Sequence, residues 1–112
     1  MSNRDAALKF LECFCAGSID GLEVFLNERL HVRGQLHQFN SRAEYLESLR
    51  ADPPQACGYD VLSVATGDDD VTVFYDYLKT EGPLTVAQLF RFDDHRIVHM
   101  QLVFDTDGFE QP

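Results

Sequence analysis

The second half of the chain consists of four long segments in which apolar side chains recur at every second position. This alternation predicts β-strands over residues 59–66, 71–80, 84–92 and 96–105. The segments between them are rich in Gly, Pro and Asp, and they are so short that they connect only antiparallel neighbours. The second half therefore predicts a meander of four antiparallel strands.

The first half of the chain begins with helical periodicity instead. Residues 5–15 place apolar side chains at spacings of three and four, Ser2 or Asn3 can cap this helix, and Gly17 ends it. Ser18 can then cap a second, short helix whose first turn is acidic. We expect two consecutive helices before the first strand.

One strand and a third helix follow. Alternation over residues 30–37 predicts the strand, and Gly34 within it indicates a bulge, a bend or a close approach of another backbone. Ser41 and Glu44 have the spacing of a capping box, so a third helix begins there and ends before two consecutive prolines. Three helices, one early strand and a meander together predict an α+β fold.

The composition fits one domain with an ordinary core. We assign residues 1–112 to a single domain, in which 45% hydrophobic residues supply a core without a disulfide or a metal. The net charge of −10 argues against nucleic acid and against an anionic membrane surface, because both need clustered Lys and Arg. We therefore expect neither of these partners.

The three cysteines, Cys13, Cys15 and Cys57, match neither a zinc site nor a Cys-x-x-Cys pair. We interpret them as buried free thiols in a reducing compartment. No signal peptide opens the chain, and no apolar run approaches the roughly 20 residues of a membrane span. The expected location is the cytoplasm, and we expect no metal and no cofactor.

The predicted sheet is apolar on both faces. The face that we expect the helices to cover carries Val71, Val73, Tyr75, Tyr77, Leu84, Val86, Gln88, Phe90, Phe92, Val98, Met100, Leu102 and Phe104. The opposite face carries Phe74, Leu78, Ala87, Leu89, Ile97 and Val103. A second copy of the chain is the simplest cover for that opposite face, so we expect a homodimer through the outer face of the sheet.

The remaining polar residues favour simple interpretations. His31 and His37 are expected on one face of the first strand without further metal ligands, and His37 is the one expected at the mouth of a pocket. Asp76 is expected on the outer face, paired with a basic residue such as Arg91. The acidic turn at residues 68–70 lacks the spacing of a calcium loop.

Several passages of the chain resemble a known family. Residues 16–22 (AGSIDGL) resemble the junction between the first two helices of SnoaL-like and ketosteroid isomerase-like proteins, which belong to the nuclear transport factor 2-like superfamily. Residues 88–94 (QLFRFDD) resemble the penultimate strand and turn of this family. Residues 96–98 (RIV) and 100–105 (MQLVFD) resemble its last strand. The resemblance covers about residues 5–105.

The resemblance implies a cone-shaped, cystatin-like α+β fold. In this family, three N-terminal helices pack on a curved, mostly antiparallel sheet and line a pocket, and dimers through the sheet are common. For such a pocket we predict these ligand-binding residues: Phe10, Phe14, Tyr59, Tyr75, Val86, Gln88, Phe90, Met100 and Leu102.

The resemblance also provides a test of catalysis. Steroid isomerase relatives use a Tyr, an Asp base and a protonated Asp, and the corresponding positions here are Phe10, Gly34 or a residue beside it, and Gln88. None of these three side chains can titrate. Polyketide cyclase relatives use a late Asp and His, for which Asp105 and His99 are the candidates, although His99 is expected to point away from the pocket.

We therefore predict a domain that binds a small hydrophobic ligand. Gln88 is either a recognition group or a structural hydrogen-bond partner of Tyr75 or of a helix residue, and these interpretations stay open. One alternative is an isomerase, cyclase or dehydratase that acts on a small apolar or polycyclic substrate through His37, Gln88 and Tyr75. Another alternative is a dimeric interaction module whose pocket is filled by side chains.

Overall fold

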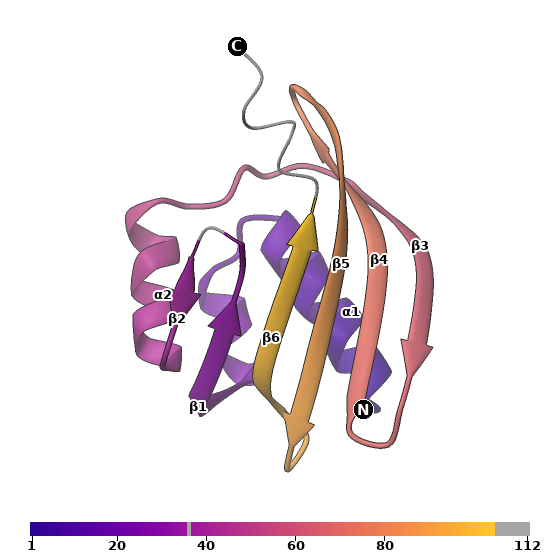
Figure 1. Cartoon of the computed structure of the whole chain (residues 1–112). Helices are drawn as coiled ribbons and strands as arrows, with labels where there is room; N and C mark the ends of the chain where they lie inside the picture. Colours follow the sequence, from indigo (N-terminus) through magenta and orange to yellow (C-terminus); the bar gives the residue numbers. More distant parts are fainter. Residues whose placement is uncertain (36, 105–112) are drawn as a thin grey trace.

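The fold is one curved sheet with its helices on one side (Figure 1). The computed structural model describes residues 1–35 and 37–104. Helix α1 spans Asn3–Cys15, a 3-10 helix (η1) spans Asp20–Phe25, and helix α2 spans Arg42–Ala51. The strands of the sheet are β1 (Leu26–Arg33), β2 (Gln38–Phe39), β3 (Tyr59–Thr66), β4 (Asp70–Lys79), β5 (Gly82–Asp93) and β6 (Arg96–Phe104).

The strand order in the six-stranded sheet is β2-β1-β6-β5-β4-β3. Strands β3 to β6 pair antiparallel as a meander, whereas β1 lies parallel to β6. A parallel pair needs a long crossover, which here includes α2 and the first three strands of the meander. The predicted α+β class, with helices on a curved and mostly antiparallel sheet, is confirmed.

The strands of the meander lie where the alternation predicted them. Strand β3 has the predicted bounds, and β4 and β5 differ from the predicted ranges by one or two residues at their ends. The prediction for the first strand was wrong: β1 spans Leu26–Arg33 rather than 30–37, because Leu26 already pairs with β6. The backbone N–H of Gly34 donates to the His37 carbonyl oxygen at 2.8 Å, which turns the chain out of the strand. The two-residue strand β2 was not predicted.

The two α-helices begin at the predicted caps, whereas the predicted cap Ser18 is wrong, because the N-cap of η1 is Ile19 and no side chain caps it. The Oγ of Ser2 accepts a hydrogen bond from the Asp5 backbone N–H at 3.1 Å, and the Oγ of Ser41 accepts one from the Glu44 N–H at 3.1 Å. Gly17, with φ of 75°, ends α1 as predicted. The second predicted helix is a single short 3-10 element, because the chain enters β1 directly after it.

A β-bulge at Val98 changes which side chains of β6 face the helices. Phe92 pairs with Ile97 and Arg91 pairs with His99, so Val98 is the extra residue between the two pairs. Ile97 was predicted on the outer face, and this was wrong, because Ile97 is fully buried in the core. An extra residue inverts the alternation locally, and a strict period of two cannot predict it.

The core lies between α1 and the concave face of the sheet. Phe10 of α1 packs edge-on against Phe90 of β5, with ring centroids 5.7 Å apart, and both rings are buried. Burial of a side chain of this size stabilises the fold by about 1.5–3 kcal/mol. None of the helices in the described part of the chain is long and apolar enough to cross a membrane.

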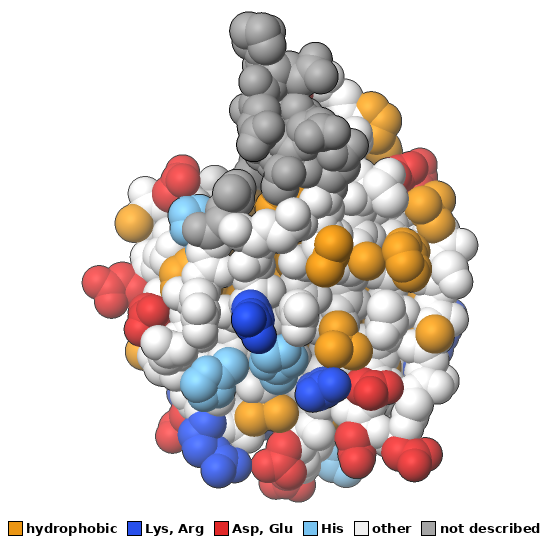
Figure 2. Space-filling view, viewed as in Figure 1, with side chains coloured by type: hydrophobic (Ala, Val, Ile, Leu, Met, Phe, Trp, Pro, Cys, Tyr) orange, Lys and Arg blue, Asp and Glu red, His pale blue; other side chains and the backbone are white. Residues whose placement is uncertain are grey.

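The convex face of the sheet, in contrast, carries apolar side chains that no described element covers. Hydrophobic side chains gather over one half of this face in Figure 2, and His, Lys and Arg side chains lie on the other half. The large exposed apolar residues on the strands are Val61, Leu62, Phe74, Leu78 and Val103.

Asp76 does not pair with Arg91, as we had predicted. Its carboxylate accepts a hydrogen bond from the Thr85 hydroxyl, Oγ1 to Oδ1 2.6 Å, across the β4–β5 pair. Arg91 lies opposite Asp70 at the other end of the same pair. The cross-strand register therefore separates the two residues that we had expected to meet.

Candidate functional site

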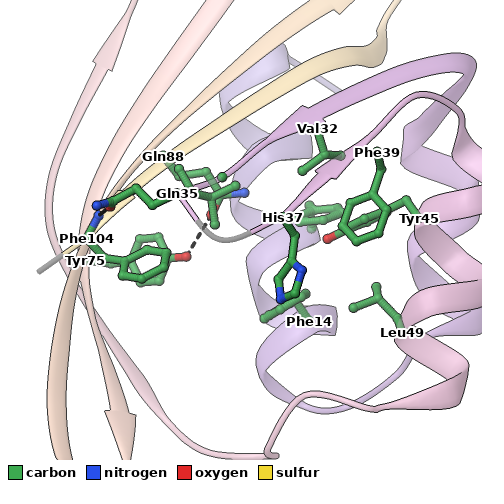
Figure 3. A pocket seen from close by; sticks show the side chains of 13 residues that line it. Phe14, Val32, Gln35, His37, Phe39, Tyr45, Leu49, Tyr75, Gln88 and Phe104 are labelled. Atoms are coloured by element: carbon green, nitrogen blue, oxygen red, sulfur yellow. Dashed lines mark hydrogen bonds between the residues drawn. The ribbon is translucent and has the colours of Figure 1, made fainter. Parts of the chain in front are cut away.

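A cavity of about 160 Å³ lies between the helices and the concave face of the sheet (Figure 3). Side chains therefore do not fill the cone completely. The residues that line the cavity are Phe10, Phe14, Val32, Gly34, Gln35, His37, Phe39, Tyr45, Leu49, Tyr75, Gln88, Leu102 and Phe104.

The α1 side of the cavity is a wall of phenyl rings. Phe10 and Phe14 are one helical turn apart, so both point to the same side of α1, and their ring centroids lie 6.2 Å apart. The Phe14 ring also lies beside the Tyr77 ring of β4, at 6.3 Å. This contact fixes the C-terminal end of α1 against the sheet.

The opposite wall comes from β2 and α2. Tyr45 and Leu49 are also one helical turn apart, on the face of α2 that looks toward the sheet. The Phe39 ring packs edge-on against the Tyr45 ring, with centroids 5.5 Å apart. Burial raises the pKa of the Tyr45 hydroxyl well above its ordinary value, so the hydroxyl stays protonated.

One buried polar pair lies at the sheet side of the cavity. The Tyr75 hydroxyl donates a hydrogen bond to Oε1 of Gln88 at 2.7 Å (Figure 3), and Nε2 of Gln88 donates to the Met100 sulfur at 3.4 Å. Burial raises the pKa of Tyr75 far above the physiological range, so its hydroxyl remains a donor. The structural hydrogen bond predicted for Gln88 is therefore present.

This hydrogen bond does not use all the capacity of the pair. A Tyr hydroxyl oxygen can also accept a hydrogen bond, and the amide of Gln88 has a second N–H. Both residues line the cavity, so they are the internal polar groups that a bound molecule would meet first.

Gln35 and His37 are the exposed members of the lining and mark its mouth. The side-chain Oε1 of Gln35 accepts a hydrogen bond from the Phe104 backbone N–H at 2.5 Å, which ties the segment after β1 to the end of β6. The His37 ring stacks on the Phe39 ring, with centroids 6.3 Å apart. His37 is thus at the mouth, as expected, although it lies after β1 rather than within it.

The cavity brings together some of the predicted ligand-binding residues. Those that line it are Phe10, Phe14, Tyr75, Gln88 and Leu102. Whether any of them binds a ligand stays a prediction.

Four predicted ligand-binding residues lie outside the lining. Phe90 and Met100 are completely buried in the core, so they support the cavity from behind. Val86 lies between Tyr75 and Phe104 in the sheet, and these larger side chains extend past it. Tyr59 lies in a shallow depression on the outside of α1, and burial and the nearby Glu12 carboxylate raise its pKa.

Sequence reasoning missed several lining residues, namely Val32, Gln35, Phe39, Tyr45, Leu49 and Phe104. Tyr45 and Leu49 had a visible signal, because helical spacing already marked them as the buried stripe of α2. Phe104 had one too, since it alternates with Leu102 on the covered face of β6. Phe39 had none, because a strand of two residues leaves no pattern.

The resemblance places the catalytic positions of steroid isomerase relatives at Phe10, at Gly34 or a residue beside it, and at Gln88. Phe10, Gly34 and Gln88 all line the cavity, and none of them is an acid or a base. Among the described residues of the lining there is no carboxylate. His99 lies outside the lining, opposite His31 and Arg91 in the sheet, and Asp105 lies outside the described residues.

Within residues 1–35 and 37–104, no group of three or more His, Cys, Asp or Glu side chains could hold a metal ion. Leu36, which belongs to the predicted first strand, and residues 105–112 lie outside the described residues.

Comparison with known proteins identifies the architecture. No family model and no curated protein sequence matches this chain. A nuclear transport factor 2-like protein of unknown function from Cytophaga hutchinsonii is similar in structure, with a TM-score of 0.85 and 17% identity over 99% of this chain and 96% of that one.

Two further solved structures are similar in the same way. A SnoaL-like protein of unknown function from Burkholderia thailandensis has a TM-score of 0.71 and 14% identity, over 92% of this chain and 93% of that one. A de novo designed protein with a curved β-sheet has a TM-score of 0.81 and 14% identity, over 98% of this chain and 93% of that one. Identities this low establish the shape and not the activity. This chain and these structures share helices packed on a curved sheet that does not close. The chain therefore has the nuclear transport factor 2-like fold.

Proposed function

We propose that this domain binds a small, uncharged, apolar or aromatic molecule in the cavity of the cone. The observation that carries the proposal is the composition of the lining, in which apolar and aromatic side chains surround the hydrogen-bonded pair Tyr75 and Gln88 and the buried Tyr45 hydroxyl. Ligand sites are typically apolar pockets in which a few polar groups fix the orientation of the ligand. The lining has this composition.

The size of the cavity limits the ligand. A cavity of about 160 Å³ is similar to the engineered apolar cavity of about 150 Å³ that accommodates benzene. A molecule with one ring therefore fits, whereas a polycyclic substrate would have to displace lining side chains or extend through the mouth. The cavity volume therefore favours a ligand smaller than a polycyclic molecule.

The charge of the surroundings favours a neutral ligand. Tyr45 and Tyr75 stay protonated because burial raises their pKa values, and no described lining residue carries a carboxylate. The chain as a whole carries a net charge of −10, which repels anions. A neutral molecule that donates a hydrogen bond to Tyr75, or accepts one from Gln88, would complete the polar pair.

Thermal unfolding with benzyl alcohol and with benzoate tests this proposal. We expect benzyl alcohol to raise the Tm of the protein by about 5 °C at ten times its Kd, since a ligand that binds only the folded state stabilises it. Benzoate has the same ring with a negative charge, and it should raise the Tm less. Equal shifts would contradict the preference for neutral ligands.

Two neighbouring residues of β6 provide a matched pair of variants. Leu102 lines the cavity, whereas Val103 points to the convex face and is 53% exposed. Leu102→Trp should fill the cavity and abolish the shift with benzyl alcohol, while Val103→Trp should leave it unchanged. A shift that survives in Leu102→Trp would show that the molecule binds elsewhere.

His37 supports an enzyme as the second candidate. Its imidazole lies at the mouth of a cavity that also contains the Tyr75 and Gln88 hydrogen-bonding groups. Histidine is the most common general acid or base, so an isomerase, cyclase or dehydratase would use His37 for proton transfer. Under this alternative, His37→Ala should abolish turnover of a cavity-binding substrate but keep the ligand-induced shift in Tm.

We also propose that the chain forms a homodimer through the convex face of the sheet. On this face, two rows of residues separate Arg91 from Asp76. The rows between them contain the apolar side chains of Phe74, Ala87 and Leu89. A two-fold axis through this apolar centre would bring Arg91 of one copy against Asp76 of the other.

A further inference from the structure

Two of the three cysteines, far apart in the sequence, lie together at the end of α1. Cys15 is the last residue of α1 and is buried, whereas Cys57 lies before β3 and is only partly buried. The backbone N–H of Cys57 donates a hydrogen bond to the Cys15 carbonyl oxygen, with an N···O distance of 2.9 Å. This bond places the two residues side by side, and a disulfide joins cysteines whose α-carbons lie about 4.4–6.8 Å apart.

The side chains of these two cysteines share a neighbour, the Tyr77 hydroxyl. Burial raises the pKa of Tyr77, and a hydrogen bond with the Cys57 side chain raises it further. Cys15 also raises the pKa of Tyr77, and Cys57 in turn raises that of Cys15. The Cys57 side chain is thus a hydrogen-bonding partner of the Tyr77 hydroxyl, and Cys15 acts on the same phenol through its charge.

Cys13 does not belong to this pair. Its sulfur lies 3.4 Å from the position that a Cβ on Gly21 would occupy, so the side chain points toward η1. Cys13 and Cys15 are also two positions apart on a helix, and such residues point in different directions. The structure thus offers one pair and one separate thiol.

We propose that Cys15 and Cys57 are a redox modification site, which hydrogen peroxide converts into an intramolecular disulfide. Cys57 is the more exposed thiol, so its thiolate attacks one peroxide oxygen, the O–O bond breaks, and hydroxide leaves as water after it takes up a proton. The Cys15 sulfur then attacks the resulting sulfenic acid of Cys57. The S–O bond breaks, and the departing hydroxide takes the Cys15 proton and leaves as a second water.

The disulfide would act on the wall of the cavity. It would close residues 16–56 into a loop and join the end of α1 to the segment before β3. Phe14, which lines the cavity and packs against Tyr77, is the residue directly before Cys15. The disulfide would therefore hold the α1 wall of the cavity in place. It would also raise the Tm by roughly 10 °C, because it constrains the unfolded chain.

The test treats the reduced, full-length protein with hydrogen peroxide. We expect the protein to lose the mass of two hydrogen atoms, and free thiols counted in denaturant to fall from three to one. Peptide mapping without reductant should join the peptide of Cys15 to that of Cys57. The Tm of the oxidised protein should return to the reduced value after dithiothreitol.

Two variants separate the proposed pair from its alternatives. Cys13→Ser should form the same disulfide, whereas Cys57→Ser should form none and should show no rise in Tm. A gain of oxygen on Cys57 without a cross-link, a bond to Cys13 or a bond between two chains would overturn the proposal. The peptide map of the oxidised native protein identifies the bonded cysteines by itself. The test therefore does not depend on how well a variant folds.

Discussion

At the scale of single residues, the Tyr75–Gln88 hydrogen bond is the feature on which the candidate site depends. Gln88 is 3% exposed and lies among apolar side chains, where an amide without a partner destabilises the fold. The bond to Tyr75 removes most of that penalty, and both residues of the pair line the cavity. One contact thus contributes both to stability and to the proposed recognition.

A double-mutant cycle at this pair measures the contact. We expect Gln88→Leu and Tyr75→Phe each to lower the free energy of unfolding by about 1–3 kcal/mol, because each leaves a buried polar group without a partner. The double variant should lose less than the sum of the two, since it leaves neither group behind. Chemical denaturation measures all four proteins, and strict additivity would show that the bond does not couple the residues.

Cys15 gives the stability a dependence on alkaline pH. Burial, with a smaller effect of Cys57, raises the pKa of Cys15 from 9.0 to about 12. The unfolded thiol loses its proton near pH 9 while the folded thiol keeps it, so the free energy of unfolding falls as the pH rises from about 9 to about 12.

The variant Cys15→Ala isolates this effect. Under reducing conditions, the native protein should lose about 1–2 kcal/mol more stability than the variant between pH 8 and pH 10. The constant cost of removing the side chain cancels in this difference. Denaturation curves at the two pH values provide the measurement, and equal losses in both proteins would rule out a buried, protonated Cys15.

At the scale of elements, α2 is the part of the site whose stability depends most on local sequence. It has only ten residues, and it carries Tyr45 and Leu49 of the cavity wall. A helix this short is marginal by itself, so its cap and its packing decide whether it forms. Ser41 provides the cap through its bond to the Glu44 N–H.

Replacement of Ser41 tests the contribution of the cap. Ser41→Ala should lower the free energy of unfolding by about 1 kcal/mol and weaken ligand-induced stabilisation, because it loosens one wall of the cavity. Ser41→Asp keeps an acceptor at the same position and should remain close to the native protein. Thermal and chemical unfolding measure both variants, and a similar loss in Ser41→Asp would assign the effect to packing of the serine instead.

At the scale of the whole molecule, the convex face of the sheet carries apolar side chains that no described element covers. Its exposed apolar side chains include Leu62, Phe74 and Val103, which are 57%, 47% and 53% exposed. Arg91 and Asp76 lie at opposite ends of the β4–β5 pair on this face, so in the proposed dimer a two-fold axis would place Arg91 of each copy near Asp76 of the other. The proposed dimer depends on this arrangement.

Charge reversal tests the arrangement directly. Arg91→Asp or Asp76→Arg alone should weaken the dimer roughly tenfold, because each places like charges together across the two-fold axis. The double variant should recover much of the lost affinity, since it restores opposite charges. Sedimentation equilibrium measures the dissociation constants, and the Tm of each variant controls for misfolding. A native protein that is monomeric at micromolar concentration would refute the dimer.

The sequence by itself determined the class of the fold and the order of its elements. Strand β3 had the predicted bounds, and the caps at Ser2 and Ser41 were correct, because alternation, helical spacing and capping act over a few neighbouring residues. For the same reason, the sequence placed Tyr75 and Gln88 on one face of the sheet.

Only the tertiary structure decided how these faces are used. The bulge at Val98 turned the Ile97 side chain to the covered face of the sheet, and the short strand β2 brought Phe39 into the cavity wall. Neither the bulge nor a strand of two residues leaves a local pattern in the sequence. The pairing of Cys15 with Cys57 likewise depends on where a distant segment of the chain returns. Contacts of this kind result from the packing of the whole chain, because each satisfies hydrogen bonds or fills space between elements that are far apart in sequence.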